Sequence, residues 1–351
     1  MRIAVANASA PVIEAIRQTI LASGYHELAW LARDGREAVA ACLHDKPDLI
    51  LMDLLLPIMD GVEATRQIMA ETPCPILIVT TNVNGRAGKV FEALGAGAFD
   101  AVNTPVPGVT ASARPLISKL QILNRLIGTA ENGVQHAPVS LESRSDEPLV
   151  LIGASAGGPA ALAVILGSLP VDFAGAMVIT QHVDAQFAES MSHWLNERST
   201  LPVRVAVEGE RPQAGHVLLS GKDAHLTFGH DGRISYQTQP ADCIYRPSID
   251  LFFESAIGHW NGKMIAVVLT GMGRDGARGM KALREAGAFT IAQDQFSSVV
   301  FGMPKSAINL GAATTVLALP RIAPAINELV SKSSQRCSLV QRNGVAARVA
   351  C

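Results

Sequence analysis

The feature that most constrains the fold is a regular alternation of short apolar runs with helix-like segments. The apolar runs of the first part cover residues 3–6, 28–32, 49–52, 76–79 and 98–102. The helix-like segments between and after them cover 11–22, 35–44, 61–70, 87–94 and 112–126. This alternation is typical of a doubly wound parallel sheet. We therefore expect an α/β domain over 1–127 that binds ligands at the carboxyl ends of its strands.

The alternation stops after residue 127 and returns at residue 148. The segment 128–147 is polar and rich in Gly, Pro and Ser, which predicts a linker. A second α/β domain with a mostly parallel sheet is expected over 148–332, with apolar strands at 149–152, 176–180 and 264–269. Its middle, 203–236, has short strand-like runs that predict an antiparallel extension of the sheet. The tail, 333–351, shows no clear pattern and is expected to be flexible.

Composition narrows the class of function. The chain has 351 residues, of which 48% are hydrophobic and 17% charged, and a net charge of −2. Two buried cores are therefore expected, and nucleic-acid binding is disfavoured because it needs clustered Lys and Arg. The five cysteines form no C-x-x-C, which predicts neither a zinc site nor a disulfide scaffold. No run is typical of a signal peptide or a membrane span, so we expect a cytoplasmic protein without membrane insertion.

Three strands of the second domain end in reactive side chains. LVLIGAS ends at Ser155, AMVITQH ends at His182, and MIAVVLTGMGRD reaches Asp275. On neighbouring parallel strands these side chains would emerge along one edge, where a Ser-His-Asp relay can assemble. Simpler interpretations exist: a turn residue or helix cap for the serine, a carbonyl partner for the histidine, and an N-cap of the following helix for the aspartate. The histidines at 216, 225 and 230 have no ligand spacing and are expected on solvated strands and turns.

The glycines of LVLIGASAGGPA, residues 149–160, suit either a phosphate cradle or an exposed nucleophile. The segment lacks both the Lys-Ser/Thr ending of a P-loop and the G-x-G-x-x-G spacing of a dinucleotide site, which disfavours a nucleotide-binding protein. The order Ser, His, Asp differs from the Ser, acid, His order of α/β-hydrolases. A second Gly-rich turn, from Thr270 to Asp275, could supply a backbone N–H to an oxyanion or form a simple anion nest.

The segments IGASAGGPAAL, ITQHV, YRPSIDLFFESA, LTGMGRDGARGM, AQDQ and GMPKSA resemble, in this order, the catalytic domain of the CheB family of protein-glutamate methylesterases. The resemblance implies hydrolysis of γ-glutamyl methyl esters, and deamidation of glutamines, on chemoreceptor-like proteins without a cofactor. It implies that Ser155 is the nucleophile, His182 the base and Asp275 the orienting acid. It further implies an oxyanion donor at the Met272 N–H and a substrate rim at Tyr245 and Arg246. Ala156 departs from the family, in which many members carry Thr.

Residues 1–127 resemble the receiver domain that this family carries in front of its esterase, a flavodoxin-like five-stranded doubly wound parallel sheet. LILMD ends at Asp53, which matches the phosphoacceptor, and Thr80 matches the switch hydroxyl. Two parts depart from the receiver pattern. Asn7 and Ala8 replace the paired carboxylates that hold Mg²⁺, and Thr104 replaces a lysine. We therefore expect at most a weak Mg²⁺ site at Asp53 and Asn7, and either poor phosphorylation or a receiver that works without phosphate.

The resemblance also implies partners and control. A histidine kinase would be the phosphodonor, a methyl-accepting chemoreceptor-like protein the substrate, and the receiver would gate the esterase in a two-component pathway. FDAVNTP and SIDLFFESAIGHWNG are most similar to the Wsp-type branch, which serves surface-sensing receptor arrays. The main alternative is a catalytically weak scaffold that binds receptors or signalling partners. A DNA-binding output is disfavoured because no helix-turn-helix pattern follows the linker.

Overall fold

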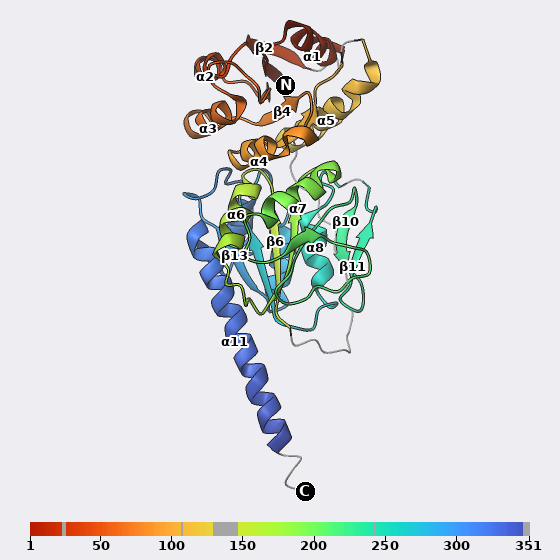
Figure 1. Cartoon of the computed structure of the whole chain (residues 1–351), viewed down its shortest axis with the longest axis vertical. Coiled ribbons are helices and arrows are strands. Elements are labelled where there is room, and N and C mark those ends of the chain that lie inside the picture. The colour runs from red at the N-terminus through yellow and green to blue at the C-terminus, as the bar shows by residue number, and fades with distance from the viewer. Residues whose placement is uncertain (23–25, 107, 129–146, 242, 347–351) are drawn as a thin grey trace. The chain divides into compact units, whose positions relative to one another are not determined.

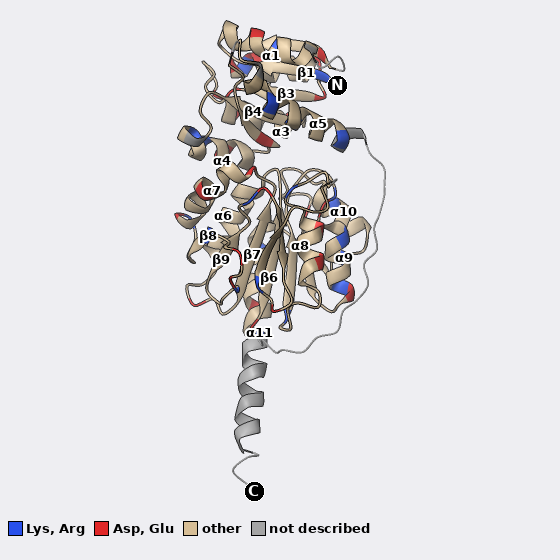
Figure 2. Cartoon of the chain, turned by 90° about the vertical axis from the view of Figure 1, so that its right-hand side faces the viewer, with Lys and Arg blue, Asp and Glu red and all other residues tan. Residues whose placement is uncertain are grey.

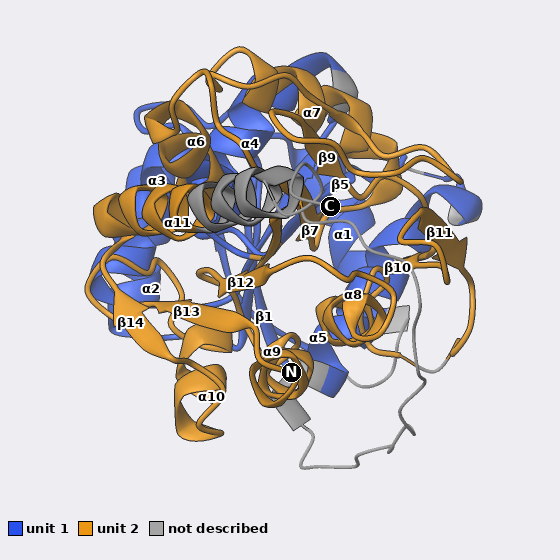
Figure 3. Ribbon diagram, turned by 90° about the horizontal axis from the view of Figure 1, so that it is seen from below, with its two compact units in different colours: residues 1–134, 156–160 blue, residues 135–155, 161–351 orange. Residues whose placement is uncertain are grey.

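The computed structural model describes residues 1–22, 26–106, 108–128, 147–241 and 243–346. The chain divides into two compact units, one of residues 1–134 with 156–160 and one of residues 135–155 with 161–351 (Figure 3). Most of the expected linker, 129–146, lies outside the described residues. No helix among the described residues is both long and apolar enough to cross a membrane. Basic and acidic residues are interspersed along the ribbon in the view of Figure 2, in keeping with the small net charge.

The first unit is built on one parallel sheet with helices around it (Figure 1). In spatial order its strands are β2 (Glu27–Ala32), β1 (Arg2–Ala6), β3 (Leu49–Met52), β4 (Ile76–Thr80) and β5 (Asp100–Asn103). The α-helices are α1 (Ala10–Ala22), α2 (Gly35–His44), α3 (Gly61–Glu71), α4 (Ala87–Gly95) and α5 (Arg114–Gly128), with short 3₁₀ helices η1 (Asn84–Arg86) and η2 (Thr110–Ala113). The predicted five-stranded, doubly wound, flavodoxin-like sheet is confirmed.

The strand order of this sheet reverses at β1. The chain runs from β1 outward to β2 and then returns to the other side of β1 as β3. Such a reversal opens a crevice beyond the carboxyl ends of the strands. Asn7 follows β1 and Asp53 follows β3, and the Asp53 N–H donates to the Ala6 carbonyl at 2.9 Å. Both side chains therefore leave adjacent strand ends beside the crevice.

The second unit has a seven-stranded sheet in which every pairing is parallel. In spatial order its strands are β14 (Thr315–Leu317), β13 (Phe289–Gln293), β12 (Met264–Val268), β6 (Leu149–Ala154), β7 (Ala176–Gln181), β9 (Val217–Leu219) and β8 (Val203–Val205). Its helices are α6 (Gly158–Ser168), η3 (Ala185–Phe187), α7 (Ala188–Asn196), α8 (Ile249–Ala256), α9 (Ala277–Glu285), α10 (Met303–Asn309) and α11 (Leu319–Ala346).

One sequence-based expectation about this unit is wrong. The strands β8 and β9 extend the sheet in parallel, whereas the antiparallel pair, β10 (His225–Phe228) with β11 (Ile234–Gln237), forms a separate two-stranded sheet. A short turn joins β10 to β11 and imposes antiparallel pairing, while the longer excursion between β8 and β9 returns the chain to the same end. The backbone of 333–346 continues α11 as a helix, and the expected flexibility of the tail stays a prediction.

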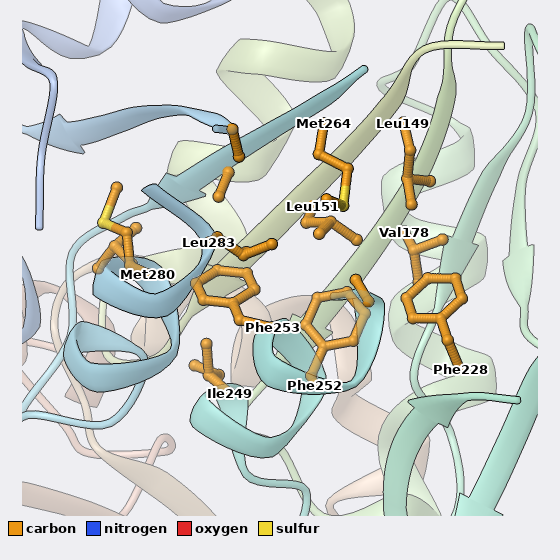
Figure 4. Close-up of a cluster of buried hydrophobic side chains, with 14 of the residues drawn as sticks. Leu149, Leu151, Val178, Phe228, Ile249, Phe252, Phe253, Met264, Met280 and Leu283 are labelled. Carbon is orange, nitrogen blue, oxygen red and sulfur yellow. The ribbon is translucent and has the colours of Figure 1, made fainter. Parts of the chain in front are cut away.

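A buried apolar cluster fixes the position of α8. Phe252 and Phe253 of this helix are fully buried and pack in one cluster with Leu149, Leu151 and Val178 of the sheet (Figure 4). Ser248 caps the helix, since its side chain accepts a hydrogen bond from the Leu251 N–H. The amino end of α8 is therefore held rigidly by packing and capping together.

We predict that Phe252→Ala destabilises the second unit by about 3–5 kcal/mol, because it leaves a cavity in this cluster. Urea unfolding followed by fluorescence or circular dichroism measures the change. Phe296→Ala is the matched control, since that ring is 99% exposed and should change the unfolding free energy by less than about 0.5 kcal/mol. Equal effects of the two variants would contradict the prediction.

Candidate active site

The site of the second unit lies where its strand order reverses. The chain runs from β6 to β7 and β9 on one side and later returns to the other side of β6 as β12. Ser155 follows β6, and its N–H donates to the Thr270 carbonyl at 3.1 Å. On the other side the His182 N–H donates to the Ala154 carbonyl at 2.9 Å. The serine therefore lies between the ends of both neighbouring strands, beside the crevice that a reversal of this kind opens.

The histidine and the aspartate are joined by a short hydrogen bond. His182 Nε2–H donates to Asp275 Oδ2 at 2.8 Å, and both side chains are more than nine-tenths buried. With the proton on Nε2, the lone pair of the ring lies on Nδ1. Within the described residues neither His182 Nδ1 nor the buried Ser155 Oγ has a hydrogen-bond partner. A free acceptor and a free hydroxyl on adjacent strand ends are the two groups that a serine nucleophile and its base require.

Asp275 is the most heavily hydrogen-bonded group of the site. Its Oδ1 accepts from the Ser248 hydroxyl and the Asp250 N–H at 3.0 Å each and from the Gly276 N–H at 3.1 Å. Its Oδ2 accepts from the Ile249 N–H at 2.7 Å as well as from His182. Burial raises the pKa of this carboxyl, but the hydrogen bond and charge of His182 and the two α8 amides outweigh it and lower the pKa below its ordinary value.

The Asp275 carboxylate therefore accepts hydrogen bonds from the first amides of α8 and does not cap α9, the helix that follows it in sequence. The N-cap of α9 is Gly276, without a side-chain hydrogen bond, so the simpler interpretation of Asp275 as the N-cap of α9 is wrong. Gly276 has φ +89°, and a Cβ there would lie 2.7 Å from Ile249 Cγ2. Only glycine allows the chain to leave Asp275 this close to the first residue of α8.

His225 supports the same helix end from behind. Its side chain is fully buried, so the expectation that it lies on a solvated strand or turn is wrong. Nδ1 accepts the Ser248 N–H at 3.1 Å, and Nε2 donates to the Pro240 carbonyl at 3.1 Å. Burial lowers the pKa of this imidazole, which favours the neutral form that both bonds require. The sequence offered no ligand spacing that could have identified this role.

The two residues predicted as a substrate rim differ in environment. The Tyr245 ring stacks on the His182 imidazole, with centroids 4.0 Å apart and planes 10° from parallel. Its hydroxyl donates to the Met272 carbonyl at 3.1 Å, and burial raises the pKa of that hydroxyl. Arg246 is exposed. Tyr245 therefore packs directly on the His182 ring, whereas Arg246 lies at the surface.

The turn that carries Met272 lies against the serine. A Cβ added to Gly271 would lie 2.7 Å from Ser155 Cβ, so this glycine permits the close approach. Gln293 holds the turn, because its Oε1 accepts the Thr270 N–H at 2.8 Å. Gln181 holds the opposite side, because its Nε2 donates to the Ser155 and His182 carbonyls at 2.9 and 3.2 Å. Neither glutamine was singled out from the sequence, since each is one polar residue at the end of an apolar run.

The receiver residues meet at the crevice of the first unit. Asn7 Nδ2–H donates to Asp53 Oδ2 at 3.0 Å, and Asn7 Oδ1 accepts the Ser9 N–H at 2.8 Å. Burial raises the pKa of Asp53, against opposing hydrogen bonds from the Leu55 N–H and the Thr80 hydroxyl and the charge of Arg86. The structure thus brings Asp53, Asn7 and Thr80 together and adds Arg86, which sequence reasoning missed.

Comparisons with known proteins agree with this arrangement. A family model described as CheB methylesterase matches residues 150–326, which include Ser155, His182 and Asp275. A model described as response regulator receiver domain matches residues 3–110, which include Asp53. The crystal structure of the Thermotoga maritima CheB methylesterase catalytic domain has a TM-score of 0.50 and 34% identity, covering 53% of this chain and 100% of that chain.

Curated relatives match nearly the whole chain. A protein-glutamate methylesterase/protein-glutamine glutaminase of Cupriavidus metallidurans is 52% identical over 331 residues, covering 92% of this chain and 97% of that protein. One of Pseudomonas fluorescens is 50% identical over 336 residues, covering 95% of this chain and 100% of that protein. Both matches extend through the receiver and the catalytic unit.

Asp250, the second residue of α8, provides a pH-dependent test of the hydrogen-bonded region around Asp275 at the amino end of this helix. Burial and the charge of Asp275 raise the pKa of its carboxyl to about 7, although the Gly279 N–H and Arg278 act to lower it. The folded chain therefore binds a proton that the unfolded chain releases between about pH 4 and pH 7. This group thus contributes less to the free energy of unfolding as the pH rises through that range.

We predict that Asp250→Asn raises the melting temperature, relative to the unmodified protein, more at pH 8 than at pH 5. Asparagine can still accept the Gly279 N–H at Oδ1, so that contact is kept. Thermal unfolding at both pH values measures the difference. Asp172→Asn at an exposed position is the control and should show no such trend. A difference that does not change with pH would contradict the prediction.

Tyr245 allows its two possible roles to be separated. Tyr245→Phe keeps a ring to stack on His182, whereas Tyr245→Ala removes it. We expect Tyr245→Ala to lower kcat for ester hydrolysis about tenfold with little change in KM, because the imidazole loses its support. Tyr245→Phe should retain most of kcat. A rise in KM with unchanged kcat in the alanine variant would instead favour a substrate rim.

Proposed function

This chain belongs to the CheB methylesterase family, and from that premise we propose that it is a response-regulator protein-glutamate methylesterase and protein-glutamine glutaminase. One observation carries the assignment to a site. The His182–Asp275 bond leaves Nδ1 of the ring without a partner, and at the adjacent strand end the buried Ser155 hydroxyl also has no partner within the described residues. A serine and a base with unused hydrogen-bonding atoms are poised for nucleophilic attack.

The reaction that we propose begins at Ser155. Its Oγ attacks the carbonyl carbon of a γ-glutamyl methyl ester while His182 Nδ1 takes the hydroxyl proton. Asp275 stabilises the imidazolium through Nε2–H, as in other Ser-His-Asp enzymes, although the ring nitrogens are exchanged relative to the trypsin-like arrangement. The Met272 N–H, in the turn that abuts the serine, would donate to the oxyanion.

The intermediate then collapses in two steps. The imidazolium protonates the leaving methoxide, methanol departs, and the glutamyl group remains esterified to Ser155. Water, deprotonated by the same Nδ1, attacks this ester, the imidazolium returns the proton to Ser155 Oγ as the ester bond breaks, and the γ-carboxylate is released. With a glutamine substrate the first leaving group is ammonia. Every proton and charge in this sequence is handled by side chains and amides of the chain, so the chemistry requires no cofactor.

We place this enzyme in a cytoplasmic two-component pathway. The substrate would be a methyl-accepting chemoreceptor-like protein, and a histidine kinase would phosphorylate Asp53 so that the receiver gates the esterase. The segments 99–105 and 248–262 support a receptor of the Wsp-type surface-sensing branch. The proposed boundaries are a receiver over 1–127, a linker over 128–147 and a catalytic domain over 148–332.

We predict that the full chain releases methanol from a methylated chemoreceptor fragment and that Ser155→Ala lowers the rate by at least about 10⁴-fold. Methanol release measured by gas chromatography or a coupled oxidase checks this. Ser168→Ala, at an exposed position at the end of α6, is the matched control and should retain the full rate.

Two outcomes of the same assay would overturn parts of the proposal. Methanol release that survives Ser155→Ala would exclude the serine mechanism. No release by any form, with receptor binding intact, would favour a scaffold. The chain 148–332 tests the gate, because its rate should exceed that of the unphosphorylated full chain.

A further inference from the structure

The phosphoacceptor pocket of the first unit has an unusual set of charges. A receiver that uses Mg²⁺ needs several oxygen ligands around its aspartate, because Mg²⁺ requires near-octahedral oxygen coordination. Here Ala8 offers no side-chain ligand, and Asn7 turns its NH₂ group toward Asp53. Among the described residues, no three or more His, Cys, Asp or Glu side chains form a group that could hold a metal ion.

The Asn7 amide cannot simply be turned over to supply an oxygen. In its present orientation the NH₂ group donates to Asp53 and the carbonyl oxygen accepts from Ser9. The opposite orientation would place the amide oxygen against a carboxylate oxygen and the NH₂ group against the Ser9 N–H. Without a cation between the two oxygens, both hydrogen bonds would be lost in the turned orientation. The pocket thus offers one carboxylate and a donating amide where the receiver pattern has further carboxylates, so the donor set present does not favour Mg²⁺.

The position at which the receiver pattern has a lysine also carries no charge in this chain, because it is occupied by Thr104. Thr104 follows β5, and its backbone N–H donates to the Thr80 carbonyl at 3.0 Å. The Thr104 side chain is 9% exposed, and its hydroxyl has no hydrogen-bond partner within the described residues. A buried hydroxyl without a partner at this sheet edge is an available donor for an anionic oxygen.

Arg86 of η1 supplies a positive charge from a different direction. Its Nη1 donates to the Thr80 hydroxyl at 3.1 Å and to the Thr81 hydroxyl at 2.9 Å. Thr80 ends β4, the strand beside the one that Asp53 follows. The hydrogen bonds of Arg86 within the described residues are both made by Nη1, which leaves Nε and Nη2 to bind another group. A guanidinium with spare donors beside a carboxylate is suited to bind phosphate oxygens in a bidentate manner.

We propose that Arg86 is the cation of this pocket, so that a phosphoryl group is transferred to Asp53 and held there without a divalent metal ion. The proposal rests on the regulatory part of the proposed function. In the transfer, a carboxylate oxygen of Asp53 forms a bond to phosphorus while the phosphorus–nitrogen bond of the phosphohistidine donor breaks. The bond's electron pair stays on the leaving imidazole nitrogen. Arg86 and the Thr80 and Thr104 hydroxyls donate to the phosphoryl oxygens.

The experiment uses the full chain with phosphoramidate, a small donor that carries the same phosphorus–nitrogen bond. The phosphorylated fraction is followed over time by intact-mass spectrometry, once with excess Mg²⁺ and once with EDTA. We expect the two rates to agree within about twofold. Arg86→Ala should lower the rate about 10- to 100-fold, the range for a lost charge-assisted hydrogen bond, and Arg86→Lys should fall between them because it keeps a point charge.

Two further variants control the measurement. Lys89→Ala removes a cation of the following helix, α4, whose partner is Asp60, and should leave the rate unchanged. Asp53→Asn should abolish labelling, which identifies the modified residue. Thermal unfolding of every variant separates loss of the pocket from loss of the fold.

Three results would overturn the proposal: a rate that rises tenfold or more with Mg²⁺, an Arg86→Ala rate equal to that of the unmodified chain, or no labelling of Asp53 in either condition. Methanol release is measured on the same preparations. Hydrolysis without labelling would refute this inference and leave the esterase assignment standing. Labelling of Asp53 without methanol release would support this inference and refute the esterase assignment.

Discussion

The carboxylate of Asp275 is the interaction on which the second unit depends. A buried charge is tolerated only when hydrogen-bond donors replace the water it has lost. Here they are the His182 ring, the Ser248 hydroxyl and three backbone amides, two of which open α8. A shift of α8 would remove two of the donors to the Asp275 carboxylate. Phe252 and Phe253, which are buried in the core, hold the helix in place. The packing of the core and the orientation of the His182 ring therefore depend on each other.

The two units solve a similar electrostatic problem with different groups. Each is a parallel sheet whose order reverses beside its first strand, and each places a carboxylate beyond a strand end. In the second unit helix amides and a histidine lower the pKa of the carboxyl. In the first unit burial raises the pKa of Asp53, and two backbone amides, the Thr80 hydroxyl and the charge of Arg86 only partly oppose it. The arrangement around Asp275 suits a permanent anion. The arrangement around Asp53 leaves hydrogen-bond donors for an incoming anion.

Much of this was predictable because strand periodicity is a local property. The alternation predicted both sheets, and Ser155, His182 and Asp275 were singled out because each comes after an apolar run. The parts that failed depend on the return path of the chain. Pairing of β8 with β9 is set by the connection between them, and His225 and Arg86 act on residues distant in sequence. No local pattern records such contacts.

The sequence by itself therefore determined the two α/β units, the order of their elements and the residue types at their strand ends. Burial of one face of a helix or strand requires apolar residues at a regular spacing, and that spacing is visible in the sequence. Tertiary structure decided the rest. It oriented the His182 ring so that Nε2–H donates to Asp275, and it placed the Asp275 carboxylate at the amino end of α8 instead of α9. It also buried His225, which accepts the Ser248 N–H, and it brought Arg86 within hydrogen-bond distance of Thr80. Hydrogen bonds and charges act over a few ångströms in space, so their partners are known only once the chain has folded.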